Sequence, residues 1–211
     1  MSNKIPFGLK NGLMVDVSSV ESGLACECVC VVCGGKLQAR KGETNAHHFS
    51  HYSKSITGCK GAAETALHLT AKQIFKDIHK IFLPPLSIEF SAVTSDGKEF
   101  VKNSGFKSSI RALHNVQLEK SLGDFKPDVL LSFRSGITLA VEIAVTHFCD
   151  AVKKEKVRNS NIYCLEIDLS KIDRLLPYKD LKNLIINDLT IKKWISFPAI
   201  KKVKQDIMLE L

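Results

Sequence analysis

The clearest hydrophobic periodicity in the chain begins near Ala62. From there apolar residues recur every three or four positions, which is the spacing of one buried helix face. They are Leu67, Ala71, Ile74, Phe75, Ile78 and Phe82. The Leu-Pro-Pro sequence at 83–85 is expected to end the helix, because proline lacks the backbone N–H. The pattern therefore predicts one helix from about residue 62 to Phe82.

Shorter apolar and β-branched runs then follow, and they are typical of strands. They lie at 86–93, around 98–101, and at 114–120, 126–133, 137–147 and 161–169. A helix is predicted from Asp150 through residue 159, and mostly helix after residue 169. Residues 1–60 contain only short apolar runs, which favour a small hairpin-based module with little core. We therefore expect a fold with α and β elements, divided into a module at 1–61 and a larger domain at 62–211.

The segment at 126–147, KPDVLLSFRSGITLAVEIAVTH, predicts a strand, a tight turn and a second strand. If residues 134–136 form a three-residue loop with positive φ at Gly136, the numbers of paired residues sum to 270. Asp128 then faces Glu142. One strand face is apolar, whereas the face with the two acids carries mainly small or polar residues.

Two opposed carboxylates repel each other unless a proton or a cation lies between them. Asp128 and Glu142 therefore predict a site for Mg²⁺ or Mn²⁺, which favour oxygen ligands. The alternative is a pair of solvent-facing acids on an exposed sheet. Three polar residues recur every four positions on the predicted helix, namely Glu64, His68 and Lys72. We expect Glu64 to be an outer metal ligand, His68 a site residue and Lys72 a phosphate contact. Alternatively they form an ordinary solvated edge.

A second group of candidate ligands lies in the N-terminal module. Cys30 and Cys33 are separated by two residues and followed by two glycines, which is typical of a zinc knuckle. Preferred partners are His51 and Cys59, with His48 as the substitute for His51. Such a small module needs a structural Zn²⁺ as a staple. The alternative is a set of buried reduced thiols beside surface histidines.

Four other cysteines are assigned no ligand role. Cys26 and Cys28 are spare thiols near the knuckle, and Cys149 and Cys164 lie in apolar surroundings as core thiols. The odd total of seven does not indicate a disulfide framework.

The charge of the chain favours a polyanionic partner. Lys and Arg number 30 against 22 for Asp and Glu, giving a formal net charge of +8. The first residues lack a signal-peptide run, and no apolar run reaches the length of a membrane span. A cytoplasmic location without membrane contact is therefore expected. The sequence leaves the oligomeric state open.

Taken together, CVVCGGKL, HHFSH, ETALH, KPDVLL and AVEI resemble the competence protein CoiA group over about residues 24–169. That resemblance implies a PD-(D/E)XK restriction-endonuclease-like core that follows an N-terminal zinc module. Such a core is a mixed sheet flanked by helices, with its elements in αβββαβ order. The resemblance also implies metal binding by Asp128 and Glu142, and a helix acid at Glu64. The wider superfamily has lysine where this chain has Ala144. Lys153, Lys156 or Lys72 can replace it, and Lys156 is preferred.

The expected function is therefore a divalent-metal-dependent nuclease that acts on nucleic acid, with DNA as the expected substrate. Basic residues after the second strand are expected to contact the phosphate backbone: Lys153, Lys154, Lys156 and Arg158. One such run is also typical of a solvated helix face. Two alternatives stay open, namely an inactive nucleic-acid-binding protein with a nuclease fold and a zinc-stapled protein adaptor.

Overall fold

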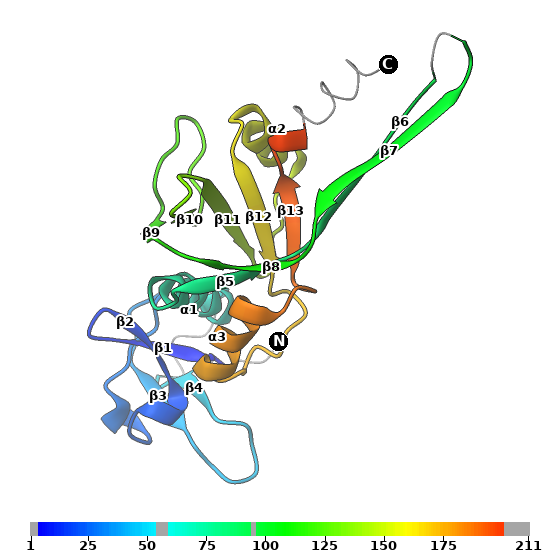
Figure 1. Ribbon diagram of the computed structural model, residues 1–211. Coiled ribbons are helices and arrows are strands. Elements are labelled where there is room, and N and C mark those ends of the chain that lie inside the picture. Colours follow the sequence, from blue (N-terminus) through cyan, green and yellow to red (C-terminus); the bar gives the residue numbers. More distant parts are fainter. Residues whose placement is uncertain (1–3, 54–58, 94–95, 201–211) are drawn as a thin grey trace. The chain divides into compact units, whose positions relative to one another are not determined.

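A computed structural model of the chain describes residues 4–53, 59–93 and 96–200 (Figure 1). The described part contains three α-helices and thirteen β-strands in several sheets, so the expected mixture of α and β structure is confirmed. The helices are α1 (Ala62–Lys76), α2 (Ala151–Asn159) and α3 (Tyr178–Asn187). Among the described helices none is both long and apolar enough to cross a membrane.

The chain folds into two compact units, each built from segments that are separated in the sequence. The first consists of Met1–Ile78, Ile143–Phe148 and Asp168–Ile186, and the second of His79–Glu142, Cys149–Ile167 and Asn187–Leu211. The expected boundary between residues 61 and 62 stays a prediction.

Two antiparallel hairpins begin the first unit, in agreement with the hairpin-based module expected there. Their strands are β1 (Phe7–Lys10) with β2 (Leu13–Asp16), and β3 (Leu37–Arg40) with β4 (His48–His51). Two short 3₁₀ helices, Val17–Ser19 and Leu24–Cys26, lie between the hairpins. Helix α1 is tied to β2 because Gln73 bonds both backbone groups of Met14, at 2.8 and 3.0 Å. The side-chain amide of Gln73 thus satisfies the backbone N–H and C=O of Met14 in the way a neighbouring strand would.

Helix α1 ends earlier than predicted. Its last residue is Lys76, and residues Lys80–Leu83 form strand β5 instead of a further helical turn. This strand pairs with β8 (Ser109–Ala112). Ile81 and Leu83 are buried on alternate positions, which is a strand pattern. The prediction was wrong because Ile78 and Phe82 are also four residues apart, so the helical spacing continued by chance across the true end.

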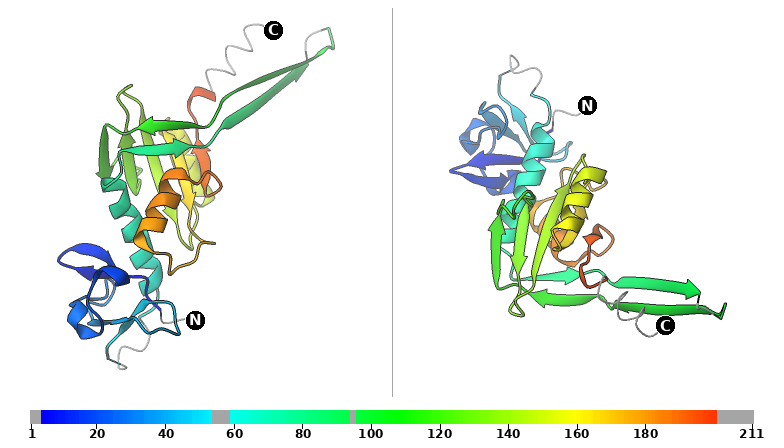
Figure 2. Two further views of the ribbon diagram at one scale, coloured as in Figure 1. Left: turned by 60° about the horizontal axis from the view of Figure 1, so that its bottom comes forward. Right: turned by 90° about the horizontal axis from the view of Figure 1, so that it is seen from above.

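A five-stranded sheet with the order β13-β12-β11-β10-β9 lies largely in the second unit (Figure 2). Its strands are β9 (Asn115–Leu118), β10 (Val129–Ser132), β11 (Thr138–Ala144), β12 (Tyr163–Asp168) and β13 (Lys192–Ser196). Another pair, β6 (Leu86–Val93) and β7 (Glu99–Phe106), forms a separate antiparallel ribbon. The β13 strand corrects the expectation of helix near the C-terminus: its aromatic and branched residues pair with β12.

The predicted β10–β11 hairpin is confirmed. Val129 pairs with Val141, so paired numbers sum to 270 as expected, and Gly136 has a φ of +82°. The Phe133 N–H donates to the Ile137 carbonyl at 3.0 Å and closes the loop. The turn therefore sets which side chains share a face of the sheet.

Both faces of this hairpin are buried. Val129, Leu131 and Val141 on the apolar face are fully buried, as predicted. The other face is covered as well, because Ala140 packs with Val157 of α2 and Cys164 of β12 in one hydrophobic cluster. The small residues on this face let helix α2 approach closely. Glu142, which lies on the same face, is thereby buried.

Candidate metal centre and carboxylate site

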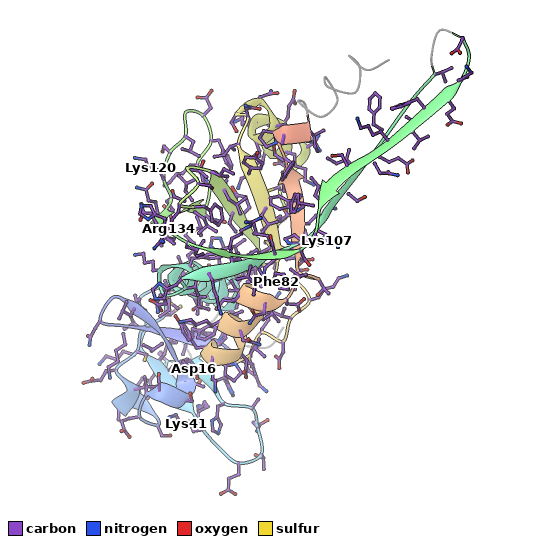
Figure 3. All side chains as sticks on the ribbon, in the orientation of Figure 1. Asp16, Lys41, Phe82, Lys107, Lys120 and Arg134 are labelled. Atoms are coloured by element: carbon purple, nitrogen blue, oxygen red, sulfur yellow. The ribbon has the colours of Figure 1, made fainter. Side chains whose placement is uncertain are left out.

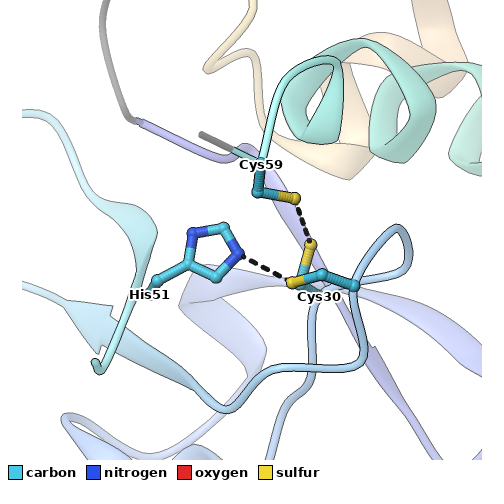
Figure 4. Close-up of side chains that lie close together, drawn as sticks. Cys30, His51 and Cys59 are labelled. Carbon is cyan, nitrogen blue, oxygen red and sulfur yellow. Dashed lines mark hydrogen bonds between the residues drawn. The ribbon is translucent and has the colours of Figure 1, made fainter. Parts of the chain in front are cut away.

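Four side chains of the N-terminal module form a compact cluster of soft metal ligands. The Sγ atoms of Cys30, Cys33 and Cys59 and a ring nitrogen of His51 all lie within 4.8 Å of one another. The two thiols of Cys30 and Cys59 are 3.7 Å apart (Figure 4). Cys33 Sγ is 3.3 Å from His51 Nε2. This preferred ligand set is therefore brought together, and three thiols with one imidazole can hold a metal such as zinc.

The local backbone explains how the first two thiols converge. The Gly34 N–H donates to the Cys30 carbonyl at 2.8 Å, and the Cys30 N–H donates to the Gly35 carbonyl at 2.9 Å. Gly34 has a φ of +69°, which favours glycine. The backbone of Gly35 also lowers the pKa of the Cys33 thiol by hydrogen bonding. This hydrogen bonding favours the thiolate form of Cys33, which is the form that binds a metal.

His48 does not belong to this cluster, which corrects its assignment as a possible zinc ligand. Its Nδ1 atom is 2.8 Å from the Ala46 carbonyl oxygen. His48 and His51 are three residues apart on β4, so they project from opposite faces of the strand. Cys26 and Cys28 are buried and donate to backbone carbonyls at 3.3 Å, so they act as core thiols.

The second candidate site centres on a buried carboxylate in β11. Glu142 is only 3% exposed, which rules out the solvent-facing alternative for this acid. Its Oε2 atom accepts a hydrogen bond from Lys153 Nζ at 2.6 Å. Lys153 is placed by the start of α2, where Asp150 Oδ1 accepts the Lys153 N–H at 2.7 Å as an N-cap. The cap fixes the first turn of the helix and thereby the reach of this lysine.

Asp128 interacts with the same carboxylate. The pKa of Glu142 is raised to about 7, chiefly by burial; the hydrogen bond and charge of Lys153 lower it, and the charge and hydrogen bonding of Asp128 raise it. Burial lowers the pKa of Lys153, but its hydrogen bond to Glu142 and the nearby negative charges outweigh this and raise it. Within the described residues, Oε1 of Glu142 is buried and has no hydrogen-bond partner. This oxygen is therefore the one that a proton or a cation would satisfy.

The other predicted site residues have different surroundings. Glu64 belongs to the first unit, where it accepts a hydrogen bond from the Thr146 hydroxyl. His68 is half-buried on α1, and Lys72 is 5% exposed, so the predicted edge is not a solvated one at Lys72. On α2, Lys154 is half-buried, whereas Lys156 and Arg158 are exposed. Their predicted roles in catalysis and phosphate binding stay predictions.

Sequence reasoning missed two features of the carboxylate site. It preferred Lys156 as the replacement lysine and gave Lys153 as an alternative, whereas Lys153 is the lysine in contact with Glu142. It also overlooked Glu166 in β12, which is 5% exposed and accepts the Cys149 N–H at 2.8 Å. The signal for Glu166 was an acid within an apolar strand run, the same signal that identified Glu142. Cys149 and Cys164 are buried, as expected for core thiols.

Comparison with known proteins adds no relative. No family model matches the chain, and no curated protein or solved structure is similar to it.

Proposed function

We propose that the chain is a divalent-metal-dependent nuclease with a structural zinc site, and that DNA is its substrate. The observation that carries this proposal is the environment of Glu142. A carboxylate 3% exposed, beside a second acid and paired with Lys153, is costly for folding and typical of a site arranged for chemistry.

The donor set suits Mg²⁺ or Mn²⁺. Asp128 and Glu142 supply hard oxygen ligands, and the buried Oε1 of Glu142 lacks a hydrogen bond in the described part of the chain. A cation shared by the two carboxylates would satisfy that atom and remove their repulsion. Asp128 and Glu142 would therefore hold the metal, which supplies a Lewis acid for phosphodiester hydrolysis when bound.

Lys153 takes the place proposed for the superfamily lysine. Position 144 is an alanine that is 2% exposed, so it offers no polar group. Lys153 brings an ammonium group to the same carboxylate from helix α2, with Nζ 2.6 Å from Oε2. From there it can orient a water molecule or bind a phosphate oxygen by charge-assisted hydrogen bonds. The lysine is thus proposed to have moved from the strand to the following helix.

Two further features support the nuclease proposal. The order α1, β9, β10, β11, α2, β12 along the chain matches the αβββαβ order of the proposed superfamily, with β5–β8 inserted after α1. The net charge of +8 favours binding to a polyanion. The resemblance to the competence protein CoiA group agrees with both.

The cysteine and histidine cluster is proposed to hold Zn²⁺ for stability. Three thiolates and one imidazole fill four tetrahedral positions, so no position stays open for a substrate. Cys30 and Cys33 come from one turn, whereas His51 and Cys59 come from later segments. Zinc would therefore tie three separate segments of a module with a small core.

A cleavage assay tests the nuclease proposal. Purified protein is incubated with linear, circular and single-stranded DNA and with RNA, in Mg²⁺, Mn²⁺ or EDTA, beside the Glu142→Gln variant. Cleavage by the wild type that requires metal and Glu142 supports the proposal. Binding without cleavage would favour an inactive nuclease fold, and no affinity for nucleic acid would favour a protein adaptor.

A further inference from the structure

We propose that the N-terminal module contains a phosphate-binding site on the β3–β4 hairpin, for the phosphate group of a nucleotide or of a nucleic-acid strand. A cavity of about 600 Å³, open to solvent, lies there. It is lined by the segment at 22–23, by the end of β3 and its following loop, and by the start of β4. This volume is within the range of small-ligand sites.

The lining side chains are polar and positively charged. Arg40 and Lys41 contribute two permanent cations, His48 adds an imidazole, and Gln38 and Asn45 add amide groups. No Asp or Glu is among the described residues that line the cavity. A pair of cations in a cavity lined by polar groups and by no acid favours an anion over an apolar or cationic ligand.

Each of the three basic groups is oriented by a contact of its own. The Nε atom of Arg40 donates to Ser50 Oγ at 3.2 Å, which leaves both Nη groups for a ligand. Lys41 Nζ donates to the carbonyls of Ser18 and Val20, which leaves one of its three protons. Lys41 is labelled in Figure 3, in the loop after β3. His48 Nδ1 donates to the Ala46 carbonyl, so Nε2 is left for a ligand and donates to a phosphate oxygen when the ring is protonated.

A phosphate group matches this set better than a carboxylate does. A phosphate monoester offers three non-bridging oxygens, one for each of Arg40, Lys41 and the protonated imidazole of His48, whereas a carboxylate offers two. A phosphodiester of a nucleic-acid strand offers two such oxygens, which Arg40 and Lys41 can bind. Two glycines of the lining also permit close approach to the backbone. Gly23 has a φ of +66°, and a Cβ on Gly23 or Gly42 would point into open space.

This inference gives His48 a role separate from that of His51. The two histidines project from opposite faces of β4, one to the cavity and one to the cysteine cluster. A metal bound at the cluster would hold one face of the strand while the other face binds the phosphate. The metal would therefore stabilise the hairpin that carries the phosphate site.

The test uses the full-length, zinc-loaded protein with Glu142→Gln and no added Mg²⁺, so that cleavage cannot consume a probe. The probes are inorganic phosphate, thymidine 5′-monophosphate and a labelled single-stranded DNA. Binding is followed by the amide signals of Gly23 and Gly42 in NMR and by fluorescence anisotropy. Arg40→Gln is compared with Lys36→Gln, an equal charge change at an exposed residue outside the cavity lining.

We expect both glycine amides to shift, and Arg40→Gln to weaken binding about tenfold, the loss of one charge-assisted hydrogen bond. Lys36→Gln should change it less than about twofold. Saturation by phosphate and the nucleotide identifies a small-ligand site, whereas a response to DNA alone identifies a strand-backbone site. Equal losses in both variants, or no shift at Gly23 and Gly42 with any probe, would overturn the inference. Because cleavage is not measured, failure of the nuclease proposal leaves this result unaffected.

Discussion

Nζ of Lys153 lies 2.6 Å from Oε2 of Glu142, so that the first turn of helix α2 is joined to strand β11 at a buried carboxylate. The lysine is 42% exposed and the glutamate side chain 4% exposed. One end of the pair is therefore open to a phosphate or to water, while the other end is held within the protein. This asymmetry agrees with the proposed contact of Lys153 with a phosphate oxygen or a water molecule.

Replacing Glu142 by Gln should abolish metal-dependent cleavage and keep the fold, because Gln retains the shape of Glu without its charge. The pKa of Glu142 is raised from 4.5 to about 7 in the folded protein. The metal-free wild type should therefore lose about 3 kcal/mol of stability as pH rises from about 4.5 to about 7, since the folded state binds the proton more tightly. Above pH 7 the variant should be the more stable protein.

Chemical denaturation at several pH values without divalent metal measures this difference. A wild type whose stability does not fall across that window relative to Glu142→Gln would contradict the burial argument. Adding Mg²⁺ should restore stability to the wild type and leave Glu142→Gln nearly unchanged.

Lys153→Ala and Lys156→Ala form a matched pair on helix α2. Lys153→Ala should reduce turnover by about 10²-fold or more, the scale of a lost positioned polar group. It should also raise the pKa of Glu142, because the lysine lowers that pKa. Lys156 is exposed on the same helix, so Lys156→Ala should change DNA affinity with the salt dependence of a phosphate contact. Single-turnover rates and the NMR titration of Glu142 separate the two, and equal turnover losses would argue against Lys153.

His51→Ala and His48→Ala test the metal centre. Protein purified without added metal should contain about one zinc per chain, and His51→Ala, like Cys30→Ser or Cys33→Ser, should lower that content and the Tm. His48→Ala should retain zinc, because His48 projects from the other strand face. Elemental analysis and thermal unfolding check both. A stable wild type without zinc would contradict the assignment.

Gly136→Ala tests the turn that aligns the two acids. Gly136 has a φ of +82°, where a Cβ meets no neighbouring atom but strains the backbone. The substitution should therefore destabilise the protein by about 1 kcal/mol, measured by chemical denaturation. Gly42→Ala is the control, because Gly42 lacks a positive φ and its Cβ also meets open space. Equal effects of the two substitutions would rule out the turn as the cause.

The sequence by itself determined the features that depend on neighbouring residues. The loop at Gly136 and the strict alternation of strands were sufficient to pair Val129 with Val141, and the Cys-x-x-Cys turn with its glycines located half of the ligand cluster. The helix expected from Asp150 to residue 159 also agrees with α2 at Ala151–Asn159. These features follow from backbone geometry over a few residues, which the local sequence specifies.

Only the tertiary structure decided which side chains meet and which are buried. The pairing of β4 with β3 decides that His51, and not His48, lies beside the cysteines. The packing of α2 on the small residues of β11 decides that Lys153, and not Lys156, reaches Glu142. The burial of Glu142 has the same origin, because its own strand pattern also fitted an exposed face. The end of α1 at Lys76 and the strand at β13 depended on pairing with distant strands. Such contacts join residues far apart in the chain, so no local pattern contains them.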